Sequence, residues 1–334
     1  MFNVFKSDRR DDLWKAIIRP PKYNYKETDL GKKELILYNK IPLIRTDVEL
    51  INKRNFKIKC SHWEIKEIQS ESCVVYLHGN SSSRFEALQL IPLLIPSFIT
   101  VFAFDFSGCG LSEGEYISLG WHEKDDVELI INYLRKEKKI EKIVLWGRSM
   151  GSSAAILYSS LNNKNDIMGM VLDSPFCSLR EVAEDIAKKN SKIPRCIMKI
   201  VWYFLKRKIQ KKAHFNINDI VPVNHVKKVN QPPAFFICSK NDKMVNPSQM
   251  EHIFQEYKGV KIFERVEGDH NSSRPQSSLK KCIKFIKKVF ANEEILEEEL
   301  EEEEGPKRSR VVSNVIPMKK IDADEIVEDE DMKK

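Results

Sequence analysis

Cysteine is sparse in this chain, and its distribution excludes two kinds of site. The seven cysteines among 334 residues are scattered singly, their total is odd, and no Cys-x-x-Cys motif occurs. Structural zinc sites and disulfide frameworks need paired cysteines, so neither is expected. Scattered free thiols are typical of a reducing compartment, and we therefore expect a cytoplasmic protein with no metal site.

Long apolar runs and an apolar N-terminus are also missing. No stretch approaches the roughly 20 apolar residues that a transmembrane helix needs. Residues 6–12 are mostly charged, where a secretory signal would have its apolar core. Phe2 also stands where N-myristoylation requires glycine. These features predict a soluble protein with no N-terminal lipid.

Charge is divided unevenly along the chain, whose formal net charge is +7. Residues 293–334 contain 16 acidic and 7 basic side chains, a net charge of −9, which leaves +16 for residues 1–292. The acidic end cannot bury apolar surface, and we predict a disordered tail whose protein partner the sequence does not identify. The basic remainder shows no recognised nucleic-acid-binding module, which excludes nucleic acid as the expected partner.

Apolar strand-like runs alternate with amphipathic helical patterns through the first half of the chain. This alternation predicts a mostly parallel sheet wrapped by helices, with functional side chains at the C-terminal ends of the strands. An earlier alternating pattern, broken by a turn at 52–55, predicts an antiparallel hairpin. The predicted strands are 73–78, 99–105, 142–147 and 168–173, and the predicted helices are 84–95, 121–139 and 150–161.

A serine lies at the junction of one predicted strand and the next helix. Gly147, Ser149 and Gly151 form a Gly-x-Ser-x-Gly sequence. In such a turn the serine has a strained backbone, and the glycines let strand and helix approach closely. A serine hydroxyl is a weak nucleophile unless a base takes its proton and an acid orients that base. The motif therefore predicts a nucleophile only if both partners follow in the chain.

Both partners are present after late strand-like runs. Asp242 follows the apolar run 234–238, and His270 lies in a glycine-containing loop after the alternating run 261–266. We predict that Ser149 is the nucleophile, His270 the base and Asp242 the acid. Asp173, at the end of the strand 168–173, is the alternative acid.

Acyl transfer also needs backbone N–H groups that stabilise an oxyanion. The residue after the serine normally supplies one, which here is Met150. The loop after the strand 73–78 supplies the other, and Asn80 is the predicted donor, with Ser81 as second choice. His78 and Gly79 in this loop are also compatible with a simple tight turn.

Together these motifs resemble the α/β-hydrolase superfamily over residues 73–290. The chain is most similar to the serine aminopeptidase and monoacylglycerol-lipase-like branch and, within it, to a largely uncharacterised group from plants and protists. The matching segments occur in family order and are His78-Gly79-Asn80, residues 105–114, residues 147–151, Leu172-Asp173-Ser174-Pro175-Phe176 and Gly268-Asp269-His270-Asn271.

The resemblance implies an α/β-hydrolase fold, with a mostly parallel central sheet, antiparallel N-terminal strands, helices on both faces, and a helical lid inserted before the acid-bearing strand. We expect an N-terminal arm at 1–34, a hydrolase domain at 35–292 with the lid at about 177–231, and the acidic tail at 293–334. The implied activity is that of a serine hydrolase, which cleaves an ester, thioester or amide through an acyl-enzyme without cofactor or metal. A catalytically silent binding or scaffold protein is the alternative.

One residue departs from the resemblance. Many lipase-type relatives carry histidine at the position of Arg148. A buried guanidinium needs a partner, and we expect an acidic side chain, with a substrate carboxylate as the alternative.

The predicted lid contains a helical pattern at 193–212 whose apolar residues cover about half of the circumference, wider than a simple core stripe. This width favours a lipid-like acyl substrate, carried by a small molecule or by a protein, with Trp202, Phe204 and Leu205 as substrate-binding residues. The basic remainder of the helix suits a peripheral contact with a membrane surface. A packed helix with a solvated basic face is the alternative.

Overall fold

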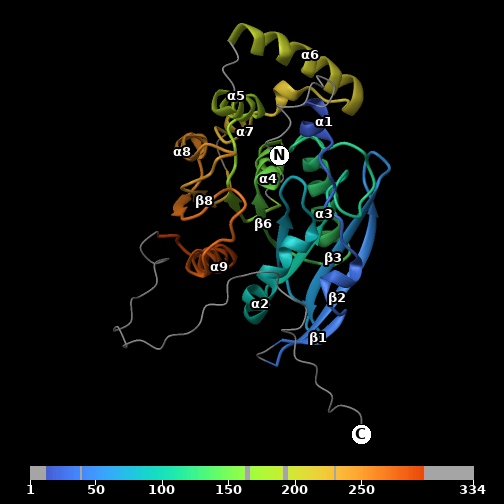
Figure 1. Ribbon diagram of the computed structural model, residues 1–334. Helices are drawn as coiled ribbons and strands as arrows, with labels where there is room; N and C mark the ends of the chain where they lie inside the picture. Colours follow the sequence, from blue (N-terminus) through green and yellow to red (C-terminus); the bar gives the residue numbers. More distant parts are fainter. Residues whose placement is uncertain (1–12, 38–39, 162–165, 191–194, 229–230, 297–334) are drawn as a thin grey trace, which may run out of the picture.

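The computed structural model describes residues 13–37, 40–161, 166–190, 195–228 and 231–296. Its strands within these ranges form one nine-stranded sheet in the order β1-β2-β3-β5-β4-β6-β7-β8-β9 (Figure 1). The strands are β1 (Glu34–Ile36), β2 (Pro42–Ile51), β3 (Lys57–Ile65), β4 (Ser72–Leu77), β5 (Thr100–Phe104), β6 (Lys142–Arg148), β7 (Gly169–Asp173), β8 (Ala234–Ser239) and β9 (Lys261–Val266).

The sheet has an antiparallel and a parallel part. β1, β2 and β3 pair antiparallel with one another, and β3 pairs antiparallel with β5. From β5 through β4, β6, β7 and β8 to β9, every pairing is parallel. The predicted α/β-hydrolase arrangement of antiparallel N-terminal strands before a parallel sheet is confirmed. The C-terminal ends of the parallel strands consequently share one edge of the sheet.

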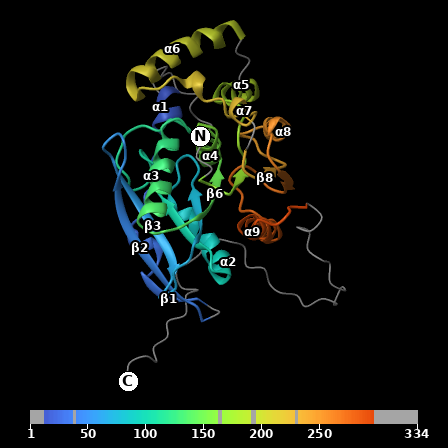
Figure 2. The same cartoon turned by 180° about the vertical axis from the view of Figure 1, so that it is seen from behind.

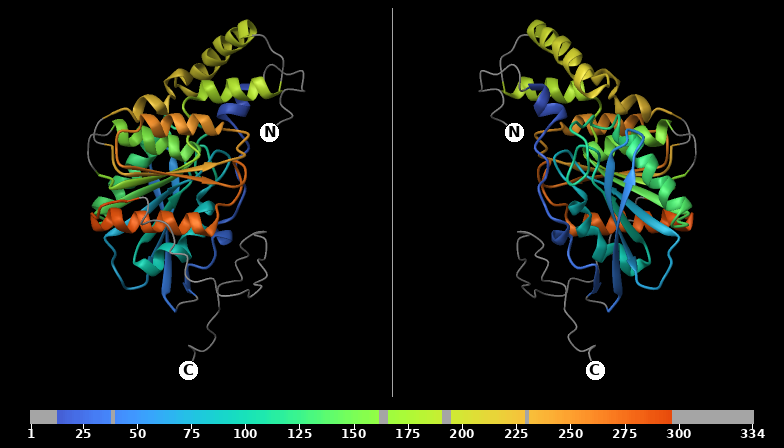
Figure 3. Two further views of the ribbon diagram at one scale, coloured as in Figure 1. Left: turned by 90° about the vertical axis from the view of Figure 1, so that its left-hand side faces the viewer. Right: turned by 90° about the vertical axis from the view of Figure 1, so that its right-hand side faces the viewer.

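Helices cover both faces of the sheet. Successive strand side chains point to opposite faces, so Val75 and Leu145 belong to one apolar layer and Val74 and Val144 to the other. Figure 3 shows α9 (red-orange) on one side of the sheet and α8 (orange) on the other. The longer helices are α3 (Glu123–Lys136), α4 (Met150–Leu161), α5 (Leu179–Asn190), α6 (Arg195–Ala213), α8 (Pro247–Glu256) and α9 (Gln276–Ala291).

One helix prediction was too simple. The segment 84–95, expected as one helix, comprises the 3-10 turn η3 (Arg84–Leu90) and the short helix α2 (Ile91–Leu94), with a second 3-10 turn, η4 (Ile95–Ser97), at its end. Pro92 and Pro96 lie at the starts of α2 and η4. Proline has no N–H for an i to i−4 hydrogen bond, so it starts a helix but interrupts a continuing one.

The segment between β7 and β8 is mainly helical where it is described. It contains α5, α6, the 3-10 turn η5 (Ile217–Asp219) and α7 (Pro222–His225). Figures 1 and 2 show these helices at the end of the molecule where α1 (Leu13–Ile18) also lies. Trp14 of α1 is buried, and the Nζ atom of Lys208 on α6 lies 5.3 Å from the centre of its ring. The N-terminal segment therefore packs against α6, while the predicted acidic tail lies beyond residue 296, outside the described residues, apart from its first four positions.

No helix in the part of the chain that the structure describes is both long enough and apolar enough to cross a membrane.

Candidate active site

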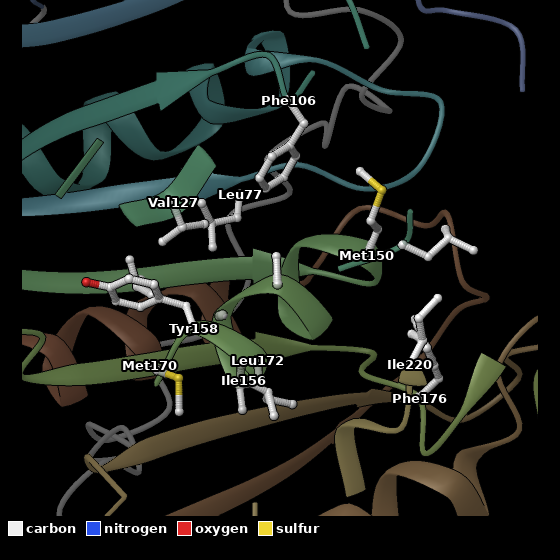
Figure 4. Close-up of a cluster of buried hydrophobic side chains, with 14 of the residues drawn as sticks. Leu77, Phe106, Val127, Met150, Ile156, Tyr158, Met170, Leu172, Phe176 and Ile220 are labelled. Carbon is white, nitrogen blue, oxygen red and sulfur yellow. The ribbon is translucent and has the colours of Figure 1, made fainter. Parts of the chain in front are cut away.

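The turn between β6 and α4 gives Ser149 a left-handed backbone, with φ of +50°. Both flanking glycines are required by close packing. A Cβ atom at Gly151 would lie 2.0 Å from the carbonyl oxygen of Leu77 on β4, and one at Gly147 would lie 2.5 Å from the backbone of Gly151. The strained serine and the tight crossing are the features of a nucleophile elbow. Met150 begins α4 directly after it, and its side chain belongs to the apolar layer shown in Figure 4.

Ser149, His270 and Asp242 meet in one chain of contacts. The Nε2 atom of His270 lies 3.1 Å from Ser149 Oγ, and the Nδ1 atom of His270 lies 2.6 Å from Asp242 Oδ2. Their exposed fractions are 9% for Ser149, 7% for His270 and 6% for Asp242. Because the carboxylate accepts a hydrogen bond from Nδ1–H, the other ring nitrogen is left to accept from the serine hydroxyl. The structure thus brings the three predicted residues together from loops after β6, β8 and β9.

The carboxylate of Asp242 is held in one orientation by hydrogen bonds to the oxygen that does not contact His270. Its Oδ1 atom accepts hydrogen bonds from the backbone N–H groups of Met244 and Val245, each at 2.8 Å. With Oδ1 occupied in this way, Oδ2 faces His270. The turn after β8 therefore sets the direction from which the carboxylate meets the imidazole.

Asp173, the alternative acid, is engaged elsewhere. Its two carboxylate oxygens accept from Nη2 and Nε of Arg274, at 2.7 and 2.8 Å. Burial alone would raise the pKa of Asp173, but the guanidinium of Arg274, the hydrogen bonds that it donates and the charge of Arg148 hold this pKa below its ordinary value. Asp173 is therefore a buried anion bound by arginine, and Asp242 is the carboxylate that contacts His270.

The partner of Arg148 differs from the one expected. Its Nη2 atom donates to the main-chain carbonyl oxygens of His270 and Ser272, at 3.1 Å each, instead of to an acidic side chain. Burial alone would lower the pKa of this guanidinium, but the charge of Asp173 raises it above its ordinary value. The reason for the difference is local: the loop after β9 crosses beside β6 and presents carbonyl oxygens there. Arg148 connects the turn at Ser149 to the loop of His270.

The predicted oxyanion donors follow neighbouring strands of the sheet. β4 pairs in parallel with β6, and Leu77 is opposite Gly147, so Asn80 and Met150 each follow these positions by three residues. The His78 ring accepts at Nε2 from the N–H of Phe106, at 3.0 Å, and its Nδ1 therefore carries the proton and donates to the carbonyl oxygen of Gly79, at 2.8 Å. The C=O and the N–H of a trans peptide point in opposite directions. His78 consequently fixes the direction of the N–H of Asn80, a role that the sequence did not indicate.

The three substrate-binding residues predicted on α6 do not share one face. Leu205 is buried, and Trp202 is half-buried, with its ring N–H donating to the side chain of Asn218 at 2.9 Å. Phe204, in contrast, is 65% exposed. Phe204 therefore does not line a pocket together with Leu205 in this structure, because the two neighbouring positions point to different sides of the helix.

Comparison with known proteins agrees with this geometry. The family model described as serine aminopeptidase, S33, matches residues 68–225. The Pyrococcus furiosus esterase Pf2001 has a similar structure, with a TM-score of 0.58 and 23% identity, over 80% of this chain and 97% of that one. The chain therefore has the fold of the α/β-hydrolases. The family match also supports the predicted branch and a hydrolase.

Curated relatives have similarly low sequence identity. The uncharacterized protein YqkD of Bacillus subtilis is 24% identical over 60% of this chain and 65% of its own length, so the match spans slightly less than two thirds of it. The yeast protein described as "uncharacterized membrane protein YNL320W" is 27% identical over 71% of this chain and 75% of its own. The names of these relatives indicate no activity or substrate.

Proposed function

We propose that this α/β-hydrolase is a serine hydrolase that cleaves a carboxylic ester, or a related thioester or amide, through an acyl-enzyme. The observation that carries the proposal is the continuous contact from Asp242 through His270 to Ser149, at 2.6 and 3.1 Å. The positive φ of Ser149 adds to it, because such strain at a strand-to-helix turn presents the hydroxyl at the top of the sheet.

Each group has one task in the proposed reaction. His270 Nε2 takes the proton of Ser149 as its Oγ attacks the acyl carbon, and then gives that proton to the departing alcohol, thiol or amine. Asp242 remains ionised and stabilises the imidazolium. The N–H groups of Met150 and Asn80 stabilise the oxyanion, and one such donor is typically worth about 3 kcal/mol. Water then attacks the acyl-enzyme through the same proton transfers and releases the carboxylic acid product.

An acyl ester with a lipid-like chain is the substrate class that we favour. Several solved structures with this fold are esterases by title, including Pf2001 and an acetyl xylan esterase from Thermoanaerobacterium. Apolar side chains of the β7–β8 segment, such as Leu205, Phe176 and Ile220, belong to the same buried layer as Met150. An acyl chain bound near Ser149 would meet this apolar side of the molecule.

Labelling with a fluorophosphonate probe tests the proposal, because the probe reacts only with an activated serine. We expect the native chain to be labelled and Ser149→Ala to remain unlabelled. Ser153→Ala is the matched control: this buried serine lies one turn further along α4, and its hydroxyl has no hydrogen-bond partner among the described residues. If folded native protein gives no label that depends on Ser149, the alternative of a silent binding protein is supported instead.

The outward face of α6 suits a peripheral contact with a membrane of anionic lipids. Ile200, Tyr203 and Phe204 are exposed large apolar residues, the last two lying one turn after the first, and Arg207 and Lys211 continue the same face as exposed basic residues. Aromatic and basic side chains on one helical face are typical of helices that lie in a membrane interface. The name of the yeast relative agrees with such a contact.

Sedimentation with phospholipid vesicles measures this contact. We expect native protein to sediment with phosphatidylserine-containing vesicles and Phe204→Ser to sediment several-fold less, since about 0.8 kcal/mol is lost for each buried CH₂ that is removed. Phe98→Ser is the control, because Phe98 is a similarly exposed phenylalanine outside α6. Equal sedimentation of both variants and the native chain would contradict the contact.

A further inference from the structure

The loop that carries His270 is held by two guanidinium groups. Arg274 donates from Nη1 to the carbonyl oxygens of Asp269 and Ser272, at 3.3 and 3.0 Å, and from Nη2 to that of His270, at 3.5 Å. Arg148, which lies far earlier in the chain, donates from Nη2 to the carbonyl oxygens of His270 and Ser272. Three main-chain carbonyls of one short loop are thus bound by two arginines.

The arginines are anchored to the sheet. Arg148 is the last residue of β6, and it is opposite Asp173, the last residue of β7. Asp173 in turn binds Arg274 through two parallel hydrogen bonds, and both side chains are buried. A buried ion pair contributes little net stability, because desolvation offsets the attraction between the charges. A buried carboxylate–guanidinium pair does, however, fix direction, because the planar fork of arginine matches both carboxylate oxygens.

The loop also has internal hydrogen bonds of its own. The side chain of Asp269 accepts from the N–H of Asn271 and the hydroxyl of Ser272, at 2.9 Å each. Gly268, with φ of +107°, connects the loop to the end of β9. These contacts shape the loop but do not attach it to β6 or β7. The loop is attached on the β8 side by the contact of His270 with Asp242 and by the hydrogen bond from the N–H of Asn241 to the carbonyl of Gly268, and on the side of β6 and β7 by the two arginines.

We propose that Arg274 and Arg148 are positioning residues, which hold the loop of His270 at the distance from Ser149 that proton transfer requires, with Asp173 as the anchor of Arg274. The inference rests on the proposed serine hydrolase function and extends it to residues that do not touch the reacting atoms. A displacement of about 1 Å in such an arrangement costs on the order of 100-fold in rate.

Lysine substitutions distinguish the two arginines. Arg274 uses Nε and Nη2 on the two oxygens of Asp173 and Nη1 on main-chain carbonyls of the loop, and a single ammonium group cannot reach them all. Arg148 reaches both of its carbonyls from Nη2 alone, so one ammonium nitrogen can replace it in part. Both substitutions keep the positive charge, which separates position from electrostatics.

The experiment compares Arg274→Lys, Arg148→Lys and Arg148→Met in kcat and KM for a soluble p-nitrophenyl ester, with thermal unfolding as the check of folding. We expect kcat to fall about 10- to 100-fold in Arg274→Lys and Arg148→Met, and by less than about tenfold in Arg148→Lys, while KM stays within about threefold of native. The rate of fluorophosphonate labelling should fall in the same proportion as kcat.

Arg135→Lys is the matched control, because Arg135 also donates from one nitrogen to two main-chain carbonyls, those of Asp166 and Glu141, at the far end of α3. Native kcat in folded Arg274→Lys, or an equal loss in Arg135→Lys, would overturn the proposal. Hydrogen exchange at residues 269–272 separates it from the proposed function. Faster exchange in Arg274→Lys supports the proposed positioning of the loop even if Ser149 proves unreactive, and unchanged exchange contradicts it even in an active enzyme.

Discussion

Turnover of an ester substrate is expected to fall by about the same large factor, on the order of 10⁶, in Ser149→Ala and in His270→Ala. The two side chains act in one step, because the hydroxyl attacks only as its proton passes to Nε2 across the 3.1 Å contact. Removing either partner disables the same step. The double variant should therefore be no slower than either single variant, and kcat for the three proteins measures this directly.

Two controls separate this result from a general effect of substitution. Ser153→Ala changes a buried serine in α4, the helix that follows Ser149, and His252→Ala changes a histidine whose side chain is half exposed on α8. Both should retain turnover within a few-fold of native. Losses in Ser149→Ala and His270→Ala that simply multiply in the double variant would contradict a shared step, since independent sites are additive in free energy.

The central part of the fold was predictable because its information is local. Strand runs such as 142–147 differ from β6 by one residue at its C-terminal end, and the predicted helix 150–161 has the bounds of α4. Gly147 and Gly151 pack closely against backbone atoms on either side of that boundary, so the two glycines mark it in the sequence. The order of nucleophile, acid and base is the one that the Gly-x-Ser-x-Gly motif implies, and the ends of late strand-like runs supplied the residues for it.

Other parts were not predictable because they depend on contacts between distant segments. Asp173 and Asp242 both follow apolar strands, and only the position of Arg274, 101 residues after Asp173, shows which carboxylate is already bound. The outward position of Phe204 likewise depends on which side of α6 faces the body. When apolar residues occupy half of the circumference of a helix, the sequence does not show which of them face the body and which face solvent.

The choice between the two acids leads to opposite expectations for two isosteric variants. Asp242→Asn is expected to lower kcat by about 10⁴ with little loss of stability. The amide oxygen can still accept from the N–H groups of Met244 and Val245, but the amide nitrogen would then face Nδ1 of His270. That nitrogen donates and cannot accept, so the imidazole is forced into the tautomer whose Nε2 already carries a proton and cannot take one from Ser149.

Asp173→Asn is expected to act mainly on stability. It leaves the buried Arg274 without its counter-charge, which costs on the order of 3–5 kcal/mol. Since the pKa of Asp173 is lowered below 3.8 in the folded chain, its ion pair stabilises the fold at pH values above 3.8 and is lost as the pH falls through the lowered pKa. The difference in free energy of unfolding between native and Asp173→Asn should therefore be full at pH 7 and shrink below pH 3.8. Denaturant unfolding at pH 7 and at a pH below 3.8 measures this difference.

Turnover and stability together decide the assignment. Some loss of kcat is expected in Asp173→Asn as well, because Arg274 holds the loop of His270, but this loss should stay far below that in Asp242→Asn. Near-native turnover in Asp242→Asn, with none in folded Asp173→Asn, would exchange the two roles. That outcome would require the loop after β9 to rearrange, since in the structure the contact of His270 with a carboxylate is the 2.6 Å one to Asp242, while both oxygens of Asp173 are bound by Arg274.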